Sequence, residues 1–122
     1  MNATYEKPIT DNQREIGNKI YSFLRSAHRN VTKEEICAYL GWEYTSSTDR
    51  KVRDTINLIK KRRPIVATPD QKGYFLCLTR DDIERCEHQC KYVDSIIEDL
   101  EQTKRPLISF LCQFEQNDDS DS

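Results

Sequence analysis

Apolar side chains recur every three or four residues in three segments of the first half of the chain, a spacing that predicts amphipathic helices. The first segment runs from Asp11 to about Ala27, and Thr10 or Asp11 can cap it. The second begins after Thr32, which matches a capping box with Glu35, and ends at the next glycine. The apolar positions of these two segments are Ile16, Ile20, Phe23, Leu24, Ile36, Cys37 and Leu40.

The third segment, residues 46–63, combines an apolar stripe with a strongly basic remainder. Apolar residues at i, i+4 and i+7 predict one buried stripe of a helix over 47–62, with Ser47 or Thr48 as its N-cap. Seven lysines and arginines against two aspartates give the segment a charge of +5, although the whole chain carries −2. Such a face can donate hydrogen bonds to phosphates and base edges. The stripe consists of Val52, Ile56 and Ile59, and the opposite side carries Ser47, Arg50, Asp54, Asn57 and Lys61, flanked by Arg53 and Lys60.

A β-hairpin is predicted directly after this helix. Pro64 has no backbone N–H and ends the helix. Residues 65–68 and 74–78 are short runs of apolar and β-branched residues, and 69–73 between them have turn chemistry. Three helices followed by a hairpin describe a winged helix-turn-helix. The predicted fold class is therefore mainly α with a small β-hairpin, followed by a long C-terminal helix.

The run RKVRDTINLIKKRRPIVATPDQKGYFL resembles the second half of the biotin-repressor-type winged helix, which is common in small phage and prophage regulators. Those proteins pair a helix of the form (R/T)-x-V-x-x-x-I-x-x-L/I with a hairpin that ends K-G-Y-x-L. The resemblance covers residues 10–78 and implies a DNA-binding regulator. In one departure, Arg62 and Arg63 replace the glycine usual near the end of the recognition helix. The hairpin motif is present here as Lys72, Gly73, Tyr74, Phe75 and Leu76.

The C-terminal third predicts a long amphipathic helix and an acidic tail. Six apolar or thiol residues recur at alternating spacings of three and four, the a/d pattern of a coiled coil. Arg105 and Pro106 are expected to break this helix and open a short final one with Leu107, Leu111 and Phe114. The stripe can pair with a second copy, giving a homodimer, or fold back on its own domain; its regular spacing favours the homodimer. The predicted dimerisation residues are Ile83, Cys86, Cys90, Val93, Ile97 and Leu100.

Four segments follow from these patterns. They are a flexible N-terminus (1–10), a winged helix-turn-helix domain (11–78), a C-terminal helical dimerisation segment (79–114) and a disordered acidic tail (115–122). With 122 residues, 36% hydrophobic and 33% charged, the chain is long enough for one small core. The sequence has no apolar run of membrane-helix length and starts without the apolar core of a secretion signal, so we expect it in the cytoplasm, the host's if it is phage-encoded.

The sequence shows little sign of enzymatic or metal chemistry. It contains no Gly-rich phosphate loop, only 2 His, and carboxylates scattered over helix surfaces, so neither an enzyme nor a cofactor is predicted. Five cysteines are an odd number, and most lie among apolar residues, as reduced thiols do. Cys86-x-His88-x-Cys90 suggests zinc, but the two thiols share a helix face from which His88 points away. No metal site is predicted.

The predicted function is to read duplex DNA with the helix over 47–62 and the wing over 68–73, as a transcriptional regulator or a phage replication or accessory factor. Asp54 opposes this unless it accepts from cytosine or pairs with Arg50 or Arg53. The alternative is a protein-binding winged-helix module, such as a phage-encoded inhibitor of a host nucleic-acid enzyme or defence system, which suits the acidic overall charge. Tyr74 is expected to be a core anchor. The predicted DNA-binding residues are Ser47, Thr48, Arg50, Lys51, Arg53, Asn57, Lys60, Lys61 and Lys72, the last equally readable as a solvated turn lysine.

Overall fold

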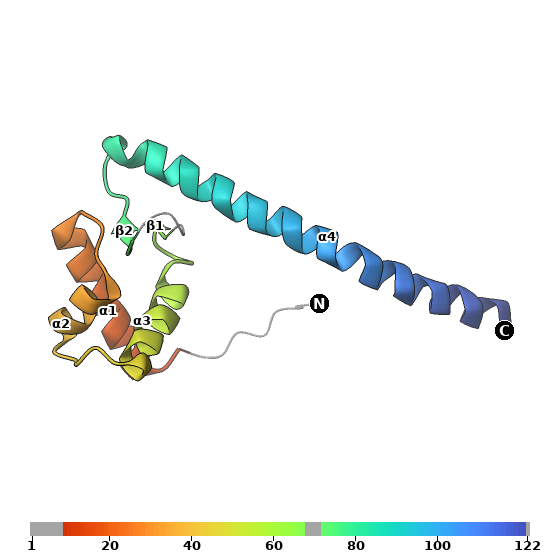
Figure 1. The fold of residues 1–122 in the computed structure, drawn as a ribbon, viewed down its shortest axis with the longest axis horizontal. Coiled ribbons are helices and arrows are strands. Elements are labelled where there is room, and N and C mark those ends of the chain that lie inside the picture. Colours follow the sequence, from red (N-terminus) through yellow and green to blue (C-terminus); the bar gives the residue numbers. More distant parts are fainter. Residues whose placement is uncertain (1–8, 68–71, 122) are drawn as a thin grey trace. The chain divides into compact units, whose positions relative to one another are not determined.

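The computed structural model describes the backbone of residues 9–67 and 72–121, and side chains as far as residue 115. The chain is mainly helical with one small antiparallel hairpin and a long C-terminal helix, as predicted (Figure 1). It forms two compact units, which divide between Cys86 and Glu87. The elements are α1 (Asp11–Ala27), α2 (Lys33–Leu40), α3 (Ser46–Ile59), β1 (Ile65–Val66), β2 (Phe75–Leu76), the 3₁₀ turn η1 (Arg80–Asp82) and α4 (Ile83–Asp121).

The first two helices begin and end where the sequence predicts. The Thr10 hydroxyl accepts from the N–H of Gln13 at 3.1 Å, and the Gln13 side chain accepts in return from the N–H of Thr10. The predicted capping box at the start of α2 forms in the same way. At their C-terminal ends, His28 and Gly41 adopt the left-handed conformation that terminates helices. These local signals fix the lengths of α1 and α2.

Helix α3 is displaced from its predicted bounds at both ends. Thr45 is its N-cap, not Ser47 or Thr48, because Thr45 and Thr48 form a reciprocal capping box two residues earlier. The helix ends at Ile59, three residues before the expected end. Both Arg62 and Arg63 donate their backbone N–H to the carbonyl oxygen of Ile59, which closes a turn ahead of the proline. The four basic residues 60–63 therefore lie in this turn.

The core of the first unit lies between α1, α2, α3 and the hairpin. Of the predicted α3 stripe, Val52 and Ile56 are fully buried and Ile59 is half-buried. Gly17 allows α1 to approach α3, since a Cβ there would lie only 3.0 Å from the Ile59 side chain. The apolar stripe thus holds one side of α3 against the core and leaves the other side outside it. The buried residues of the cluster are Ile20, Leu24, Val31, Ile36, Cys37, Val52, Ile56, Ile65 and Leu76.

The hairpin is shorter than the two predicted strands but is extended by a third segment. Ile65 pairs with Leu76, and Val66 with Phe75. Val31, between α1 and α2, exchanges two backbone hydrogen bonds of 2.8 Å with Tyr74. This bridge ties the hairpin to the helices. Residues 68–71, most of the predicted wing, lie outside the described residues, as do residues 1–8 of the predicted flexible N-terminus.

Helix α4 is continuous through Pro106, so the predicted break at that residue is wrong. A proline removes one backbone donor, and the hydrogen bonds on either side carry the helix across it. The helix also continues to Asp121, where a disordered tail was expected from residue 115; Ser122 lies outside the described residues. Extending an existing helix requires no new nucleation, so polar residues can continue it. No described helix has a stretch long and apolar enough to cross a membrane.

The boundary between the units lies inside α4, not before residue 79 as predicted. Arg85, in the first turn of α4, packs its guanidinium over the Phe75 ring at 4.2 Å. It also donates to the Asn30 side chain at 3.5 Å. Asp82, just before α4, bonds His28 at 2.8 Å. These contacts make the start of α4 part of the first unit.

Candidate functional site

The polar side of α3 is exposed, as its spacing predicts. Ser47, Arg50, Lys51, Arg53 and Asn57 are all exposed on it. Lys60 and Lys61 are exposed in the turn after α3, and Lys72 is exposed beside the start of β2. Among the predicted contact residues on α3, Thr48 serves in the cap: its hydroxyl donates to the carbonyl oxygen of Glu43 at 2.7 Å and lies 3.2 Å from the Thr45 hydroxyl.

A cluster around Asp49 joins three parts of the first unit. Lys33 of α2 places its ammonium 2.9 Å from one carboxylate oxygen of Asp49, and the Tyr44 hydroxyl donates to the same carboxylate at 2.7 Å. Arg53, one turn further along α3, donates through Nε to the other oxygen at 3.0 Å. The Asp49 side chain is only 17% exposed. The cluster fixes the start of α2 and the loop before α3 against α3 itself.

Hydrogen bonding in this cluster shifts two pKa values in opposite directions. The bonds from Lys33 and then Tyr44 lower the pKa of Asp49 to about 2. The hydrogen bond from Tyr44 to Asp49 also raises the pKa of Tyr44 to about 12, because the hydroxyl donates to a carboxylate. At neutral pH the cluster therefore holds an ionised Asp49, two cations and a neutral phenol. Its net charge is +1.

The cluster changes the predicted role of two residues. The pairing of Arg53 with Asp54 considered from the sequence does not form, since Arg53 pairs with Asp49. That bond uses Nε, and the two terminal nitrogens of the guanidinium take no part in it. Arg53 is thus fixed in direction while part of its donor set stays available to a ligand. Lys33 was absent from the predicted set, because its spacing in the sequence gives no sign that it lies against α3.

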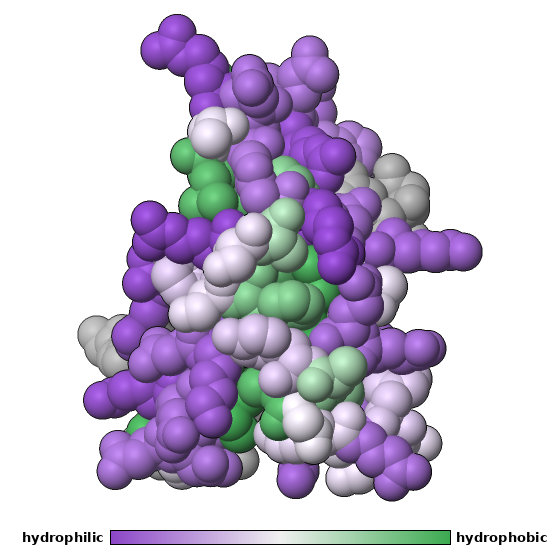
Figure 2. Space-filling view, turned by 90° about the vertical axis from the view of Figure 1, so that its left-hand side faces the viewer, coloured by the Kyte–Doolittle hydropathy of each residue, from purple (hydrophilic) through white to green (hydrophobic). Residues whose placement is uncertain are grey.

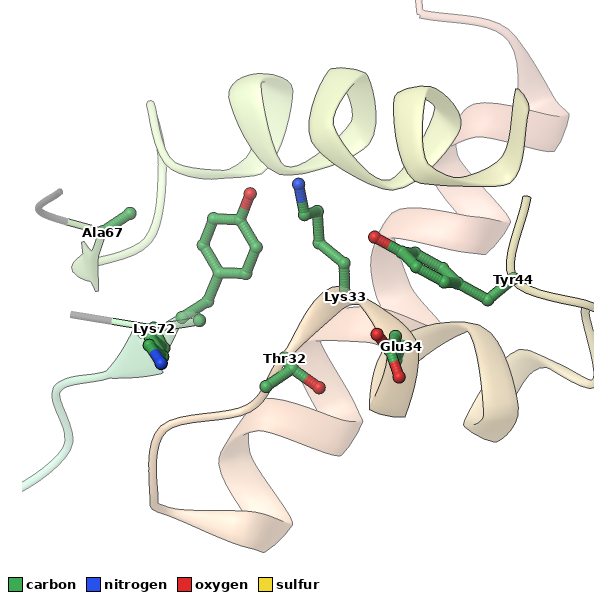
Figure 3. A pocket seen from close by; sticks show the side chains of 8 residues that line it. Thr32, Lys33, Glu34, Tyr44, Ala67 and Lys72 are labelled. Carbon is green, nitrogen blue, oxygen red and sulfur yellow. The ribbon is translucent and has the colours of Figure 1, made fainter. Parts of the chain in front are cut away.

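A hollow of about 360 Å³ lies beside the cluster, between the start of α2, the loop before α3 and the hairpin. Figure 3 shows the Lys33 side chain extending toward α3, with the Tyr44 hydroxyl directed toward it and Lys72 on the hairpin side. Tyr74 is half-buried and packs against the core, as predicted, and burial raises its pKa. The hollow is lined by Thr32, Lys33, Glu34, Tyr44, Ala67, Lys72, Gly73 and Tyr74.

On the other flank of α3, basic side chains lie over aromatic rings. The Lys51 ammonium lies 5.7 Å from the centre of the Trp42 ring. The Arg63 guanidinium lies 4.3 Å from the Tyr21 ring on α1, which holds the turn after α3. Arg50 and Asn57 occupy the middle of the exposed side between these flanks. The predicted basic residues thus surround one exposed helix face, although they do not converge on a single point.

The thiols and acids of the described residues form no metal-binding group. Within residues 9–67 and 72–121, no three His, Cys, Asp or Glu side chains are placed to hold one ion. The five cysteines are free; Cys37 is buried, whereas Cys90 and Cys112 are exposed. Cys90 is one of the residues predicted to lie in the dimerisation stripe.

No protein-family model matches this chain, and neither a curated protein nor a solved structure is detectably similar to it. The resemblance to biotin-repressor-type winged helices therefore stays a prediction from the sequence. What the site can do follows from its own residues. They present guanidinium, ammonium, amide and hydroxyl donors around one helix. A polyanion is the kind of ligand that such a surface is best suited to bind.

Proposed function

We propose that the first unit is a winged helix-turn-helix that binds duplex DNA, with the exposed side of α3 in the major groove. One observation carries the proposal: α3 is held to the core by Val52 and Ile56 and presents Arg50 and Asn57 on its opposite side. Arg53 is exposed on the flank of the same helix. An α-helix fits the major groove, where arginine recognises guanine and asparagine recognises adenine by paired hydrogen bonds.

The surrounding lysines suit the phosphate backbone. Lys33 at the start of α2 and Lys72 beside the hairpin lie on one side of α3, across the hollow. Lys60 and Lys61 follow its C-terminal end. Contacts of this kind position a protein on the duplex and release counterions, so binding should weaken steeply with salt. The hairpin takes the place of the wing in this arrangement.

The Asp49 cluster acts as a positioning device in this proposal. The carboxylate directs Arg53 along α3 and holds Lys33 near the groove. Asp54, exposed on the same helix, is suited to accept from a cytosine amino group. We place the protein in the cytoplasm, the host's if it is phage-encoded, as a non-enzymatic transcriptional regulator or replication factor.

Titration of a fluorescent random duplex at low salt tests the proposal. Arg50→Ala and Arg53→Ala should each weaken binding by about 1–3 kcal/mol, or roughly five- to 150-fold, with little change in Tm because both side chains are exposed. Lys33→Ala should weaken DNA binding. It should also reduce the slope of log Kd against log salt by the contribution of about one phosphate contact. Arg25→Ala removes an exposed arginine on α1 that does not line the hollow and is the charge-matched control. Wild-type affinity in both arginine variants would contradict the proposal.

A second candidate function, protein binding, rests on a different face. Tyr39 on α2 is 50% exposed and stacks on Phe23 of α1, with ring centres 4.4 Å apart. Figure 2 shows the face with α1 and α2, where hydrophobic and weakly polar side chains form a strip framed by hydrophilic ones. Exposed aromatic residues of this kind are common at protein interfaces. Absence of any mobility shift with random duplex at low salt would favour this function, for example as an inhibitor of a nucleic-acid enzyme.

A further inference from the structure

Large apolar side chains are exposed along almost the whole of α4. Leu100 is 61% exposed and Leu107 is 62% exposed, and both lie in the second unit. An isolated helix does not keep such a face in water when a partner is at hand. The exposed apolar residues of α4 are Ile83, Val93, Ile96, Ile97, Leu100, Leu107, Ile108, Phe110, Leu111 and Phe114.

The continuity of α4 through Pro106 extends the a/d pattern far beyond residue 100. Spacings of three and four persist to Phe114, so one seam runs along about five heptads. Lys104 is the single charged residue in it. Pro106 falls at an outward position, and its missing N–H does not disturb the seam. The seam consists of Ile83, Cys86, Cys90, Val93, Ile97, Leu100, Lys104, Leu107, Leu111 and Phe114.

We infer that a second copy of this chain pairs with α4 in the antiparallel direction along this whole seam, with Ile97 of one copy packed on Leu100 of the other. This inference adds a direction and a register to the homodimer predicted from the sequence. It rests on the proposed function in one respect: the two copies would supply two DNA-binding faces. When the two helices overlap antiparallel about the contact of Ile97 with Leu100, every seam residue lies opposite a seam residue of the other copy. In this overlap, Ile83 lies opposite Phe114 of the other copy.

Side-chain size favours the antiparallel direction. A parallel pair would place each residue opposite itself, so Cys86 and Cys90 would form two thin layers while Phe114 formed a thick one. In the antiparallel pair each thiol lies opposite a leucine: Cys86 opposite Leu111, and Cys90 opposite Leu107. Facing a small residue with a large one keeps the helices at an even separation and the core filled.

Charge also favours it. In a parallel pair, Lys104 would face its own copy inside the seam, and two buried ammonium groups repel. In the antiparallel pair Lys104 lies opposite Val93, beside Asp94 of the second copy. Asp94 and Glu101 of the two copies would face each other across the seam, and Lys104 between them offsets the repulsion of their like charges. The charged residue in the seam therefore matches the antiparallel direction.

Direction determines where the two first units are attached. Ile83 and its counterpart would be separated by 31 residues of helix, about 46 Å at 1.5 Å per residue. In a parallel pair the two starting points would be neighbours. An antiparallel dimer would hold its two DNA-binding units at opposite ends of the helix pair.

Sedimentation equilibrium of the full chain in reducing buffer without DNA tests the pairing. We expect a dimer of twice 14.4 kDa at tens of micromolar. Val93→Asp combined with Ile97→Asp should give a monomer, whereas Ser95→Asp, which lies outside the seam and is exposed, should leave the dimer intact. If the wild-type chain sediments as a monomer, the inference is wrong. A chain in which α4 folds back on its own first unit would give this result.

Cross-linking tests the direction, in a background with Cys77→Ser, Cys86→Ser and Cys112→Ser that leaves Cys90 and the buried Cys37. Leu107→Cys should then form a disulfide with Cys90 of the second copy under mild oxidation, and further Cys90→Ser should abolish the covalent dimer. Persistence of the covalent dimer after Cys90→Ser would show residue 107 facing itself and overturn the antiparallel direction. DNA binding by the monomeric Asp variant, sensitive to Arg50→Ala, would show that the proposed function stands even if the pairing fails.

Discussion

The Asp82 carboxylate accepts three hydrogen bonds within the first unit. It accepts from the backbone N–H of Leu78 at 2.8 Å, from His28 at 2.8 Å and from the N–H of Thr79 at 3.1 Å. Its side chain is only 9% exposed. These bonds, that from Leu78 first, lower its pKa from the ordinary 3.8 to about 2. The ionised form thus joins the end of α1, the segment after β2 and the start of α4.

A lowered pKa makes Asp82 a source of pH-dependent stability. Because the folded state prefers the ionised form, the contribution is complete above about pH 4 and is lost as the pH falls toward the folded pKa. Asp82→Asn should therefore lower Tm at pH 7, and its difference from wild type should shrink between about pH 4 and pH 2. Circular dichroism melts across this range measure the effect. Asp81→Asn, at the exposed neighbouring position, is the control; a gap for Asp82→Asn that is constant with pH would contradict the assignment.

At this scale the sequence predicted what depends on neighbours along the chain. Thr32 and Glu35 lie three residues apart, so their capping box follows from spacing alone. The Asp49 cluster could not be predicted in the same way, because Lys33 and Tyr44 reach it only after α2 and α3 have packed. The sequence therefore supplied the exposed donors on α3 but missed the lysine beside them.

At the scale of elements, Gly73 allows the hairpin backbone to approach the backbone of Val31, between α1 and α2, closely. Its φ of 106° lies in the region that favours glycine, and a Cβ there would lie 2.3 Å from the carbonyl oxygen of Val31. Gly73→Ala should break the bridge between Val31 and Tyr74 and lower Tm far more than Gly41→Ala. Gly41 also has a positive φ, but a Cβ there meets nothing within 4 Å, so strain alone should cost about 1–2 kcal/mol. Equal losses in both variants would contradict this role of Gly73.

The packing of α3 is tested by Ile56→Ala. Ile56 is 1% exposed at the centre of the apolar stripe, so the cavity left behind should lower the free energy of unfolding by about 2–5 kcal/mol. Asn57→Ala, at the next and exposed position, should change it by less than about 0.5 kcal/mol. Urea denaturation at neutral pH measures both. Similar midpoints for the two variants would mean that α3 is not packed by this stripe.

Element boundaries were predictable where one signal stood alone. Gly41 ends α2 without a competing signal. At the start of α3 four candidate caps follow one another over residues 45–48, and the choice of Thr45 depends on its exchange of hydrogen bonds with Thr48. Pro106 led to the wrong prediction of a helix break. A proline usually ends a helix, but α4 continues through this residue and loses only one backbone donor there.

For the whole molecule, the charges are separated along the chain. The formal charge is −2, yet residues 46–63 carry +5, so the rest of the chain is acidic. Residues 115–122 contribute four acids and no base. A cationic face and an acidic segment in one chain attract each other over about a Debye length, roughly 10 Å at 0.1 M salt. In the proposed function the acidic segment would compete with DNA for the basic face.

Deleting residues 115–122 tests this competition and leaves the seam of α4 intact, because the seam ends at Phe114. The deletion raises the formal charge from −2 to +2, since four acids leave. We expect affinity for random duplex to rise at low salt and the gain to vanish at high salt, where both interactions are screened. Replacing the four acids by Asn and Gln at full length is the matched control, and it should reproduce the gain if charge rather than length is responsible. Equal affinities of the deleted and full-length chains at low salt would show that the acidic segment has no part in DNA binding.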